Sequence, residues 1–285
     1  MALQVTPIRA EHLEQVGRFL HEQMGRRISA EAWVRSLTHH WAAEVPNHGM
    51  QLRDGGRLVG VLLAVYSDQT IGGGIERFCN PHSWCVLDGY RSGSLQLVLD
   101  VIRQRGYHFT MYTPNPKVAE VFLGLRFRLL DDRLLYLPHL PAPGSRRGGR
   151  FAEDAPERIA ARLDGVARAE YEAHRGIPWL RFIAFGGPGD VCLAVYKPMR
   201  WKRMPGAHLL HLSDPSALER HGALLRQHLL LRAGLMVTRV EARLLSSVPR
   251  GAILSRRTQP KLISSRTLTD GQARDIYSEL VALDL

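Results

Sequence analysis

The chain has 285 residues, of which 45% are hydrophobic, and a mean hydropathy of −0.16. These values are typical of a globular protein with one large or two modest domains, and they exclude a disordered or collagen-like chain. No stretch approaches the roughly 18 consecutive apolar residues of a membrane span, and residues 1–7 carry no basic-then-apolar export signal. We therefore expect a cytoplasmic protein without a membrane span.

The three cysteines, Cys79, Cys85 and Cys192, include no CxxC pair. The sequence therefore predicts neither a disulfide framework nor a metal site. No histidine or asparagine stands at a spacing that marks it as a partner for a cysteine nucleophile. Small buried hydrophobic residues are the better interpretation of these thiols.

Positive charge is concentrated in the second half of the chain. Residues 1–140 carry 15 basic and 13 acidic side chains, whereas residues 141–285 carry 23 and 14. Almost all of these cations are arginines, which favour bidentate contacts with phosphate or carboxylate. Two interpretations remain open, an anionic partner of the second half and a biased base composition of the coding genome.

The first half of the chain alternates helical and strand patterns. Helical spacing of apolar residues, N-cap residues and turn signals predict two helices, a hairpin, and then alternating strands and helices. In chain order the helices and strands are expected at 8–20, 29–41, 50–53, 57–66, 75–87, 94–105, 107–112, 117–123, 127–130 and 134–137. The last two ranges are expected to form a strand pair.

A segment rich in proline, glycine and arginine at residues 138–150 interrupts these patterns and indicates a linker. We expect a first domain over residues 1–140, a linker over 141–155 and a second domain over 156–285.

The second half repeats much of the same order, which suggests a duplicated unit. It comprises an expected helix at 158–175, a hairpin formed by 179–185 and 191–196, a strand at 207–212, a helix at 217–231 and a strand at 236–245. The basic cluster Lys197–Arg203 interleaves cations with Trp201, which suits an anionic sugar, a nucleotide or single-stranded nucleic acid; a solvated loop is the alternative. Residues 276–283 are expected to dock as a closing element.

Residues 83–131 resemble the GNAT superfamily of acyl-CoA N-acyltransferases. Residues 84–91, WCVLDGYR, look like the end of the central strand of that family entering its acyl-CoA loop, and residues 92–99 look like the helix that follows. Residues 112–127, YTPNPKVAEVFLGLRF, are similar to its next strand, short helix and closing Leu-Gly-Phe signature. The resemblance implies an α+β fold with two GNAT-like units, each a mostly antiparallel central sheet flanked by helices. The second unit lacks phosphate-cradling glycines after residue 212.

The resemblance also implies acetyl-CoA or another acyl-CoA as co-substrate, held where a turn opening a helix presents N–H groups to the pyrophosphate. The residues expected to bind it are Val86, Leu87, Arg91, Ser92, Gly93, Ser94, Leu95 and Asn115. This chain departs from the family pattern at Ser94 and Gln96, which stand where glycines are expected, and at Arg126, which replaces the glycine of Leu-Gly-Phe. These departures put acyl-CoA binding in doubt more than the fold.

Three residues are candidates for proton transfer, since direct attack of an acceptor amine or hydroxyl on the thioester requires no covalent enzyme intermediate. Glu76 and His82 are candidate bases, and Tyr112 is a candidate acid for the departing thiolate. Each also has a structural interpretation: a solvated strand-end carboxylate, a polar loop histidine and a half-buried strand aromatic.

The leading function is therefore an acyl-CoA-dependent acyltransferase, with acetyl transfer to an amine or hydroxyl of a small molecule or sugar precursor. The alternative is a catalytically degenerate GNAT-like module that senses a ligand or binds an anionic partner. The expected partner is a small-molecule or glycan acceptor. Nucleic acid is disfavoured because the chain carries no recognised nucleic-acid-binding motif.

Overall fold

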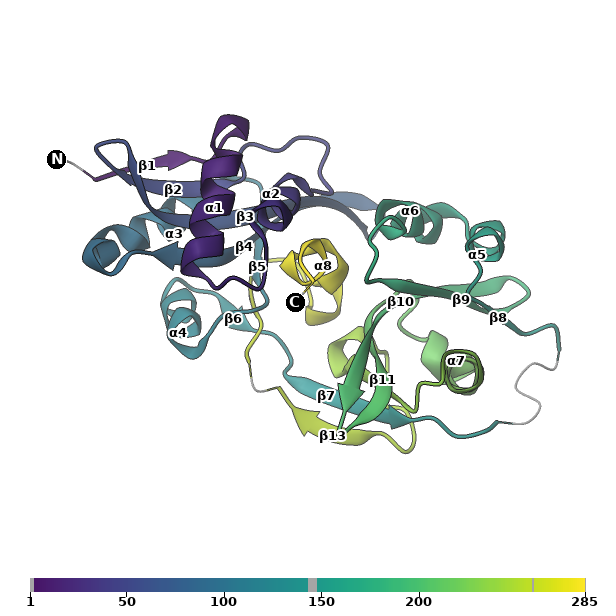
Figure 1. The fold of residues 1–285 in the computed structure, drawn as a ribbon. Coiled ribbons are helices and arrows are strands. Elements are labelled where there is room, and N and C mark those ends of the chain that lie inside the picture. The colour runs from purple at the N-terminus through teal and green to yellow at the C-terminus, as the bar shows by residue number, and fades with distance from the viewer. Residues whose placement is uncertain (1–2, 143–147, 258, 285) are drawn as a thin grey trace. The chain divides into compact units, whose positions relative to one another are not determined.

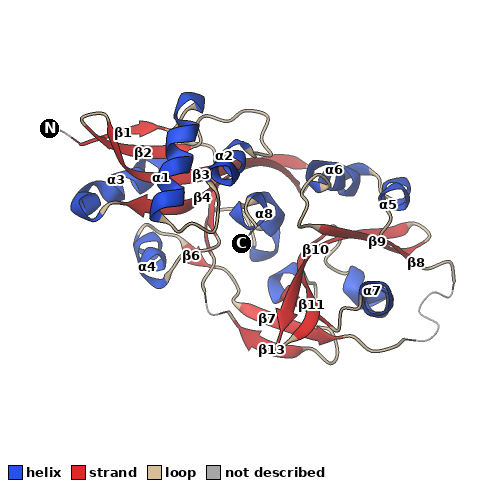
Figure 2. Ribbon diagram, in the orientation of Figure 1, coloured by secondary structure: helices blue, strands red, loops and turns tan. Residues whose placement is uncertain are grey.

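A computed structural model describes residues 3–142, 148–257 and 259–284. The chain divides into two compact units. Unit 1 comprises residues 1–130, 259–268 and 277–285, and unit 2 comprises residues 131–258 and 269–276. Over the described residues, each unit contains a seven-stranded, mostly antiparallel sheet flanked by helices (Figures 1 and 2). The expected α+β fold class is confirmed.

Unit 1 contains one mixed sheet and helices on both of its faces. Its strands, in sheet order, are β1 (Leu3–Pro7), β2 (Gly49–Asp54), β3 (Arg57–Ile71), β4 (Gly74–Val86), β5 (His108–Met111), β14 (Leu262–Ser264) and β6 (Arg128–Leu129). Its helices are α1 (Leu13–Gln23), α2 (Ala30–Thr38), α3 (Ser94–Ile102), α4 (Pro116–Gly124) and α8 (Glu279–Ala282), with short 3-10 turns η1 (Ala10–His12) and η2 (Asp88–Gly93).

The helices of unit 1 form where the apolar spacing predicts them. Val16 and Leu20 of α1 are fully buried on one face of the sheet together with Trp33 of α2. Ser29 caps α2, since its side chain accepts a hydrogen bond from the Ala32 amide at 3.2 Å. On the opposite face, Leu97 of α3 and Phe122 of α4 pack in a second core. The sheet is therefore covered on both sides by apolar packing. A polar side chain that is buried near these two cores is an exception to this pattern.

The strands β4 and β5 diverge after a short stretch of parallel pairing. They pair only at Phe78 with His108 and at Cys79 with Phe109, and β4 then continues to Val86. A β-bulge also interrupts the pairing of β4 with β3, because the register shifts between Val61 and Leu63. Bulges bend a strand and re-aim its side chains. Here the second half of β4 has no neighbouring strand on its β5 side among the residues that the structure describes.

A distant segment of the chain completes the sheet of unit 1. Leu262 of β14 pairs with Met111 of β5 and with Leu129 of β6, and its side chain is fully buried. The expected strand pair at 127–130 and 134–137 is wrong, since β6 pairs with β14 and the following strand enters the sheet of unit 2. Three residues are too few to show a strand periodicity, so the sequence did not signal β14.

Unit 2 is built on the same scheme with a different order of pairing. Its strands, in sheet order, are β13 (Ile253–Arg256), β7 (Arg133–Pro138), β12 (Val237–Glu241), β11 (Met204–Leu212), β10 (Asp190–Trp201), β9 (Arg181–Gly187) and β8 (Phe151–Glu153). Its helices are α5 (Pro156–Arg162), α6 (Gly165–His174) and α7 (Ala217–Ala233), with 3-10 turns η3 (Ala242–Leu244) and η4 (Asp270–Gln272); a further turn, η5 (Asp275–Tyr277), follows.

Two expectations for unit 2 need correction. The single helix expected at 158–175 is divided into α5 and α6, because the two residues between them, Leu163 and Asp164, have an extended backbone with ψ of 145° and 177°. The basic cluster Lys197–Arg203 is not a loop, since it continues β10 and closes the β10–β11 hairpin. Lys202 and Arg203 form the turn with φ of 47° and 71°, values that two-residue hairpin turns require.

The segment Thr269–Ile276 is held to unit 2 by a buried ionic cluster. Arg243 donates through Nε to Glu241 at 2.6 Å and through Nη2 to Asp275 at 2.5 Å. The side chains of both carboxylates are fully buried. This cluster anchors the chain between the two stretches, 259–268 and 277–285, that belong to unit 1.

The unit boundaries differ from the expected domain boundaries. The chain leaves unit 1 after Leu130, ten residues before the expected boundary at 140, and later returns to it twice. Within the expected linker 141–155, residues 151–153 form β8, and residues 143–147 lie outside the described residues. None of the described helices is long and apolar enough to cross a membrane.

Candidate active site

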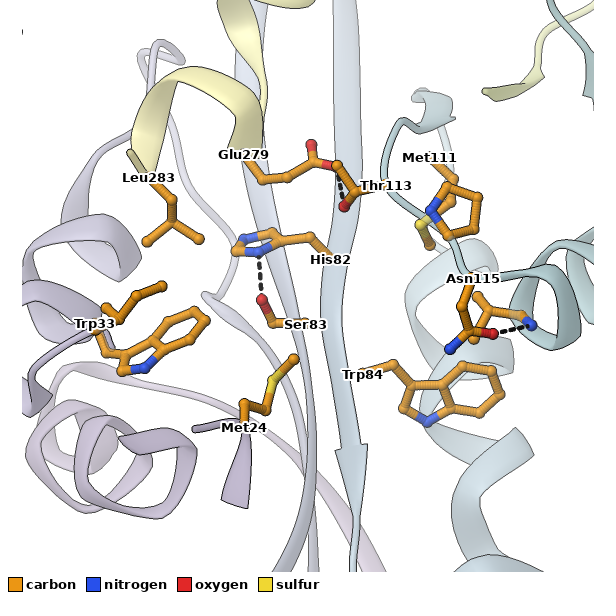
Figure 3. A pocket seen from close by; sticks show the side chains of 13 residues that line it. Met24, Trp33, His82, Ser83, Trp84, Met111, Thr113, Asn115, Glu279 and Leu283 are labelled. Carbon is orange, nitrogen blue, oxygen red and sulfur yellow. Dashed lines mark hydrogen bonds between the residues drawn. The ribbon is translucent and has the colours of Figure 1, made fainter. Parts of the chain in front are cut away.

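A pocket of about 310 Å³ lies in unit 1 where β4 and β5 diverge. Its walls come from the bulge of β4, the residues after β5, the α1–α2 region and the C-terminal helix α8 (Figure 3). The lining residues are Met24, Ile28, Trp33, His82, Ser83, Trp84, Met111, Thr113, Pro114, Asn115, Val118, Glu279 and Leu283. A volume of this size suits one small molecule.

The bulge presents His82 to the pocket as a buried, neutral imidazole. Its side chain is 2% exposed, and its Nδ1 lies 3.0 Å from the Ser83 hydroxyl oxygen. Nε2 is buried and has no hydrogen-bond partner among the described residues. Burial, followed by the nearby His40, lowers the pKa of His82 to about 3. The imidazole therefore stays neutral at physiological pH, and its unprotonated nitrogen can accept a hydrogen bond.

Ser83 holds an unusual backbone conformation at the same bulge. Its φ of 51° lies in the left-handed region, which costs an L-residue other than glycine about 1–2 kcal/mol. Strain of this kind persists where the surrounding structure imposes it, and it is concentrated at functional sites. Ser83 and His82 thus form a strained, hydrogen-bonded pair at the wall of the pocket.

The C-terminal helix contributes a carboxylate to the pocket. Glu279 is 1% exposed, and its Oε1 accepts a hydrogen bond from the Thr113 hydroxyl at 2.9 Å. The Glu279 amide donates to Asn80 Oδ1 at 3.0 Å, and Ser278 caps the helix through the Leu280 amide. In Figure 3, Glu279, Thr113 and His82 lie at one end of the pocket. These contacts fix the position of the Glu279 carboxyl group in the pocket.

Aromatic and thioether side chains form the other part of the pocket. Trp33, Trp84 and Met24 lie away from the Glu279 end in Figure 3. Trp84 is held edge-on against Phe122, with ring centroids 6.4 Å apart. The indole Nε1 atoms of Trp33 and Trp84 are buried without a hydrogen-bond partner among the described residues. Trp33 and Trp84 lie on opposite sides of β4 in this view, so apolar side chains line the pocket on both sides of the strand.

Comparison with known proteins places this pocket in a known fold. No family model matches the chain, and no curated protein matches it. Three solved structures are similar. A GCN5-related N-acetyltransferase from Anabaena variabilis has a TM-score of 0.59 at 12% identity, covering 92% of this chain and 72% of its own. A conserved protein of unknown function from Enterococcus faecalis, described as a probable N-acyltransferase, has a TM-score of 0.62 at 8% identity, covering 95% and 74%. A GCN5-related N-acetyltransferase from Kribbella flavida has a TM-score of 0.59 at 17% identity, covering 92% and 70%.

The chain has the GNAT fold. At these identities the similarity establishes the fold alone, and the chemistry must be argued from the residues of this chain. Some of the site residues predicted from the sequence line this pocket, and others do not.

Of the three candidate proton-transfer residues, only His82 lines the pocket. Glu76 lies near the start of β4, where its carboxylate accepts from His108 Nε2 at 2.9 Å with 39% of its side chain exposed. His82 follows Glu76 by six positions on β4, which is about 20 Å along an extended strand. Tyr112 is 3% exposed and lies against the Lys261 ammonium, 4.7 Å from its ring centroid. Its neighbours Met111 and Thr113 line the pocket, and Tyr112 does not.

Of the predicted acyl-CoA residues, Asn115 lines the pocket and the others follow the bulge. Asn115 caps α4 by accepting from the Val118 amide at 3.0 Å. Val86 ends β4, and the Leu87 amide donates to Val59 at 2.9 Å. None of the predicted residues from Val86 to Leu95 lines the pocket.

The predicted phosphate turn is folded as the 3-10 turn η2, which leads directly into α3. Arg91 pairs with Asp88 at 2.6 Å on the surface, and Ser92 and Gly93 end η2. Ser94 uses both of its donors within the turn, its hydroxyl and its amide each bonding to the Arg91 carbonyl oxygen, while Leu95 is 44% exposed.

One departure from the family pattern, Gln96, and the nearby Gly93 both have local explanations. A Cβ at Gly93 would come within 3.2 Å of side-chain atoms of Leu52 and Leu3, so a larger residue there would require these side chains of β1 and β2 to shift. The Gln96 side chain donates a hydrogen bond to Asp100 at 2.6 Å, so its bulk lies along the surface of α3. Both positions are therefore accounted for by contacts within unit 1.

The sequence did not indicate five residues of the pocket: Met24, Ile28, Trp33, Glu279 and Leu283. Met24 follows the end of α1, and Trp33 was predicted only as an apolar residue of a helix. The residues of α8 were expected to dock, with no indication of where. Glu279 directly precedes the apolar tail segment Leu280–Leu283. This carboxylate was the one available signal that the tail does more than pack.

Proposed function

We propose that this protein is an acyl-CoA-dependent acyltransferase whose reaction takes place in the pocket of unit 1. The co-substrate is acetyl-CoA or another acyl-CoA, and the acceptor is an amine or hydroxyl of a small molecule. The observation that carries the proposal is the bulge of β4, where a strand edge without a strand partner meets the buried, neutral imidazole of His82.

The β4 edge is suited to hold the thioester arm. Beyond Cys79, no strand within the described part of the chain pairs with β4 on its β5 side, so the backbone groups of β4 can bond to an extended chain with amides, as a further strand would. The same edge leads through Val86 to η2 and to the N-terminus of α3, which favours the negative charge of a diphosphate. Arg91 lies in this turn and can exchange its pairing with Asp88 for a phosphate oxygen.

His82 is the proposed base. The acceptor nitrogen or oxygen forms a bond to the acyl carbon as the bond from that carbon to sulfur breaks, and the acceptor proton passes by way of Nε2 of His82 to solvent, because the lowered pKa of the imidazole keeps it from retaining the proton. The negative charge that develops on the acyl oxygen needs nearby N–H donors, which the backbone of the bulge can supply. The sulfur leaves as the thiolate and is protonated from solvent.

The proposal is tested first by calorimetric titration with acetyl-CoA and desulfo-CoA, with ATP as a control for nonspecific anion binding. We expect micromolar binding of both CoA compounds and weak binding of ATP. Ser94→Asp, which adds a negative charge at the start of α3, should weaken CoA binding. The exposed Thr267→Asp adds the same charge outside the pocket and should leave binding unchanged.

Absence of CoA binding, or equal binding of all polyanions, would overturn the acyltransferase proposal in favour of a non-catalytic ligand-binding module. If CoA binds, thiol release is then followed for wild type and His82→Gln. We expect about a 10²–10⁴-fold lower rate for the variant, since this is the usual contribution of a positioned base. Unchanged turnover would remove His82 from the mechanism.

A further inference from the structure

We propose that unit 2 contains a second binding site, which takes a small phosphate monoester. The site is a cavity of about 290 Å³ between the end of β7 with the residues after it, the middle of α7 and the residues before β13. Arg226 and Arg250 line this cavity and hold the phosphate group. The inference does not depend on the proposed acyltransferase function, because every lining residue belongs to unit 2. It gives the arginine-rich second half of the chain an anionic partner.

The charged side chains that line this cavity are both positive. Among the described residues, no aspartate or glutamate lines it, and no carboxylate forms an ion pair with Arg226 or Arg250. Arg220, on the same helix as Arg226, is different, since it pairs with Asp190 at 2.7 Å. Two like charges around one cavity repel each other, and an anion bound between them replaces this repulsion with attraction.

Arg226 is a partly buried cation without a compensating charge. Burial lowers the pKa of its guanidinium group, because the charged form loses contact with water. Other partly buried arginines of unit 2 have acidic partners: Arg274 pairs with Glu170 at 2.5 Å, and Arg257 pairs with Glu241. Burial of a charged group is costly unless the group is paired. A bound anion would supply the partner that the described residues do not give to Arg226.

The neighbouring His139 responds to the charge of Arg226. His139 is 6% exposed; its Nδ1 donates to the Leu235 carbonyl oxygen at 2.7 Å, and its Nε2 lies 2.8 Å from the Thr238 hydroxyl oxygen. Burial lowers the pKa of this imidazole, the hydrogen bond to Leu235 opposes that effect, and Arg226 lowers the pKa further. The positive charge of Arg226 therefore acts on its surroundings, as expected for a guanidinium group that no carboxylate neutralises.

Charge and size together favour a small phosphate monoester. Guanidinium groups hold phosphate oxygens through paired N–H donors, and two of them match the nearly two negative charges of a monoester at neutral pH. The rest of the wall is mostly apolar, so a short carbon body can pack against it; the apolar residues are Pro138, Leu140, Pro141, Ala142 and Ala223. A volume of about 290 Å³ lies at the lower limit of small-molecule sites, which disfavours an oligonucleotide or a glycan chain.

Calorimetric titration of the whole protein with three probes tests the site. Phenyl phosphate carries both proposed features, inorganic phosphate lacks the apolar body and benzyl alcohol lacks the charge. We expect phenyl phosphate to bind about 10-fold more tightly than inorganic phosphate, and benzyl alcohol not to bind. Phenyl phosphate should still bind in the presence of excess desulfo-CoA, since the proposed CoA site lies in unit 1. Absence of phenyl phosphate binding, or its displacement by desulfo-CoA, would overturn the inference.

Single substitutions then locate the bound anion without any measurement of turnover. Arg226→Gln and Arg250→Gln should each weaken phenyl phosphate binding about 10-fold, because each removes charge-assisted hydrogen bonds. Arg250 is exposed, so its substitution leaves the packing of unit 2 intact even where Arg226→Gln lowers stability.

Arg232→Gln is the matched control, since it removes the same charge from the same helix outside the cavity. It should leave the affinity for phenyl phosphate unchanged. Undiminished binding by both cavity variants, or an equal loss in Arg232→Gln, would contradict the assignment by showing that net charge alone attracts the anion. These results are independent of whether acyl-CoA binds in unit 1.

Discussion

The Ser83 hydroxyl oxygen lies 3.0 Å from His82 Nδ1, and Ser83 itself has a φ of 51°. The hydrogen bond sets the orientation of the imidazole, and whichever atom donates also sets the tautomer. If Nδ1 carries the proton and donates to Ser83, the lone pair of Nε2 is directed toward the pocket as an acceptor. The strained serine is thus a positioning residue for the proposed base.

Two substitutions at Ser83 separate its backbone role from its side-chain role. Ser83→Ala keeps the strain and removes the hydroxyl, and we expect a lower kcat with little change in the KM for acyl-CoA. Ser83→Gly also removes the hydroxyl but relieves the strain, and should raise the free energy of unfolding by about 0.5–1 kcal/mol relative to Ser83→Ala. Urea denaturation and steady-state kinetics of the two proteins check these expectations. Equal stability of the two variants would mean that the backbone of Ser83 is not strained.

Buried histidines should make the protein sensitive to acid. Burial lowers the pKa of His82 to about 3 and, with a contribution from His48, that of His40 to about 4, below an ordinary value of 6.5. Between these folded values and 6.5 the unfolded chain binds more protons, so stability is complete above about pH 6.5 and falls as the pH falls. Each such histidine removes up to about 1.4 kcal/mol per pH unit in this window.

Urea denaturation of wild type and His82→Gln at pH 8, 6.5 and 5 measures this effect. We expect no difference in slope between pH 8 and 6.5, and a weaker loss of stability below pH 6.5 in the variant. An identical acid dependence in the two proteins would show that His82 does not titrate on unfolding.

Arg126 stands where a glycine would be more stable. It follows the C-terminal end of α4 with a φ of 66°, and the Phe127 amide closes the turn by donating to Phe122 at 3.1 Å. This is the left-handed position that usually carries glycine at the end of a helix. Arg126→Gly should therefore raise the free energy of unfolding by about 0.5–1 kcal/mol. Arg105→Gly, at an exposed site without a positive φ, should not stabilise the protein, and thermal denaturation of both variants provides the comparison.

The ionic cluster of unit 2 should be costly to break. Asp275→Ala leaves the buried Arg243 with one carboxylate fewer, and loss of one partner from a buried ion pair costs about 3–5 kcal/mol. Asp132→Ala removes the surface pair with Arg256, which is 76% exposed, and should cost no more than about 1 kcal/mol. Chemical denaturation of the two variants gives the difference. Similar losses would show that the buried cluster contributes little beyond its surface counterpart.

Local signals in the sequence predicted most of the elements and the fold class. Ser29 capped a helix as expected, the Asp54-Gly55-Gly56 turn joined two strands, and the residues around the bulge carried the resemblance to the GNAT fold. These features depend on neighbours in the chain, so residue type and spacing were sufficient to find them.

The parts that sequence reasoning missed depend on distant contacts. His82 was found because it adjoins the resembling segment, but Glu279 reaches the same pocket from nearly 200 positions later. Glu76, an equally good candidate on residue type, lies on the same strand but outside the pocket. Glu279 shares the pocket with His82 because the chain returns to unit 1 near its C-terminal end. The periodicity of a single sequence cannot predict such a return.

Because Leu262 pairs with both Met111 and Leu129, the sheet of unit 1 cannot be completed until the ribosome has synthesised residue 262. When the ribosome has made the first 130 residues, β5 and β6 still lack the strand that joins them, so the nascent sheet keeps two open edges. Translation of the whole of residues 131–258 must intervene before that strand emerges, a delay of several seconds at about 5–20 residues per second. All seven strands of the unit 2 sheet lie within residues 131–258, so this sheet can form before the sheet of unit 1 is completed.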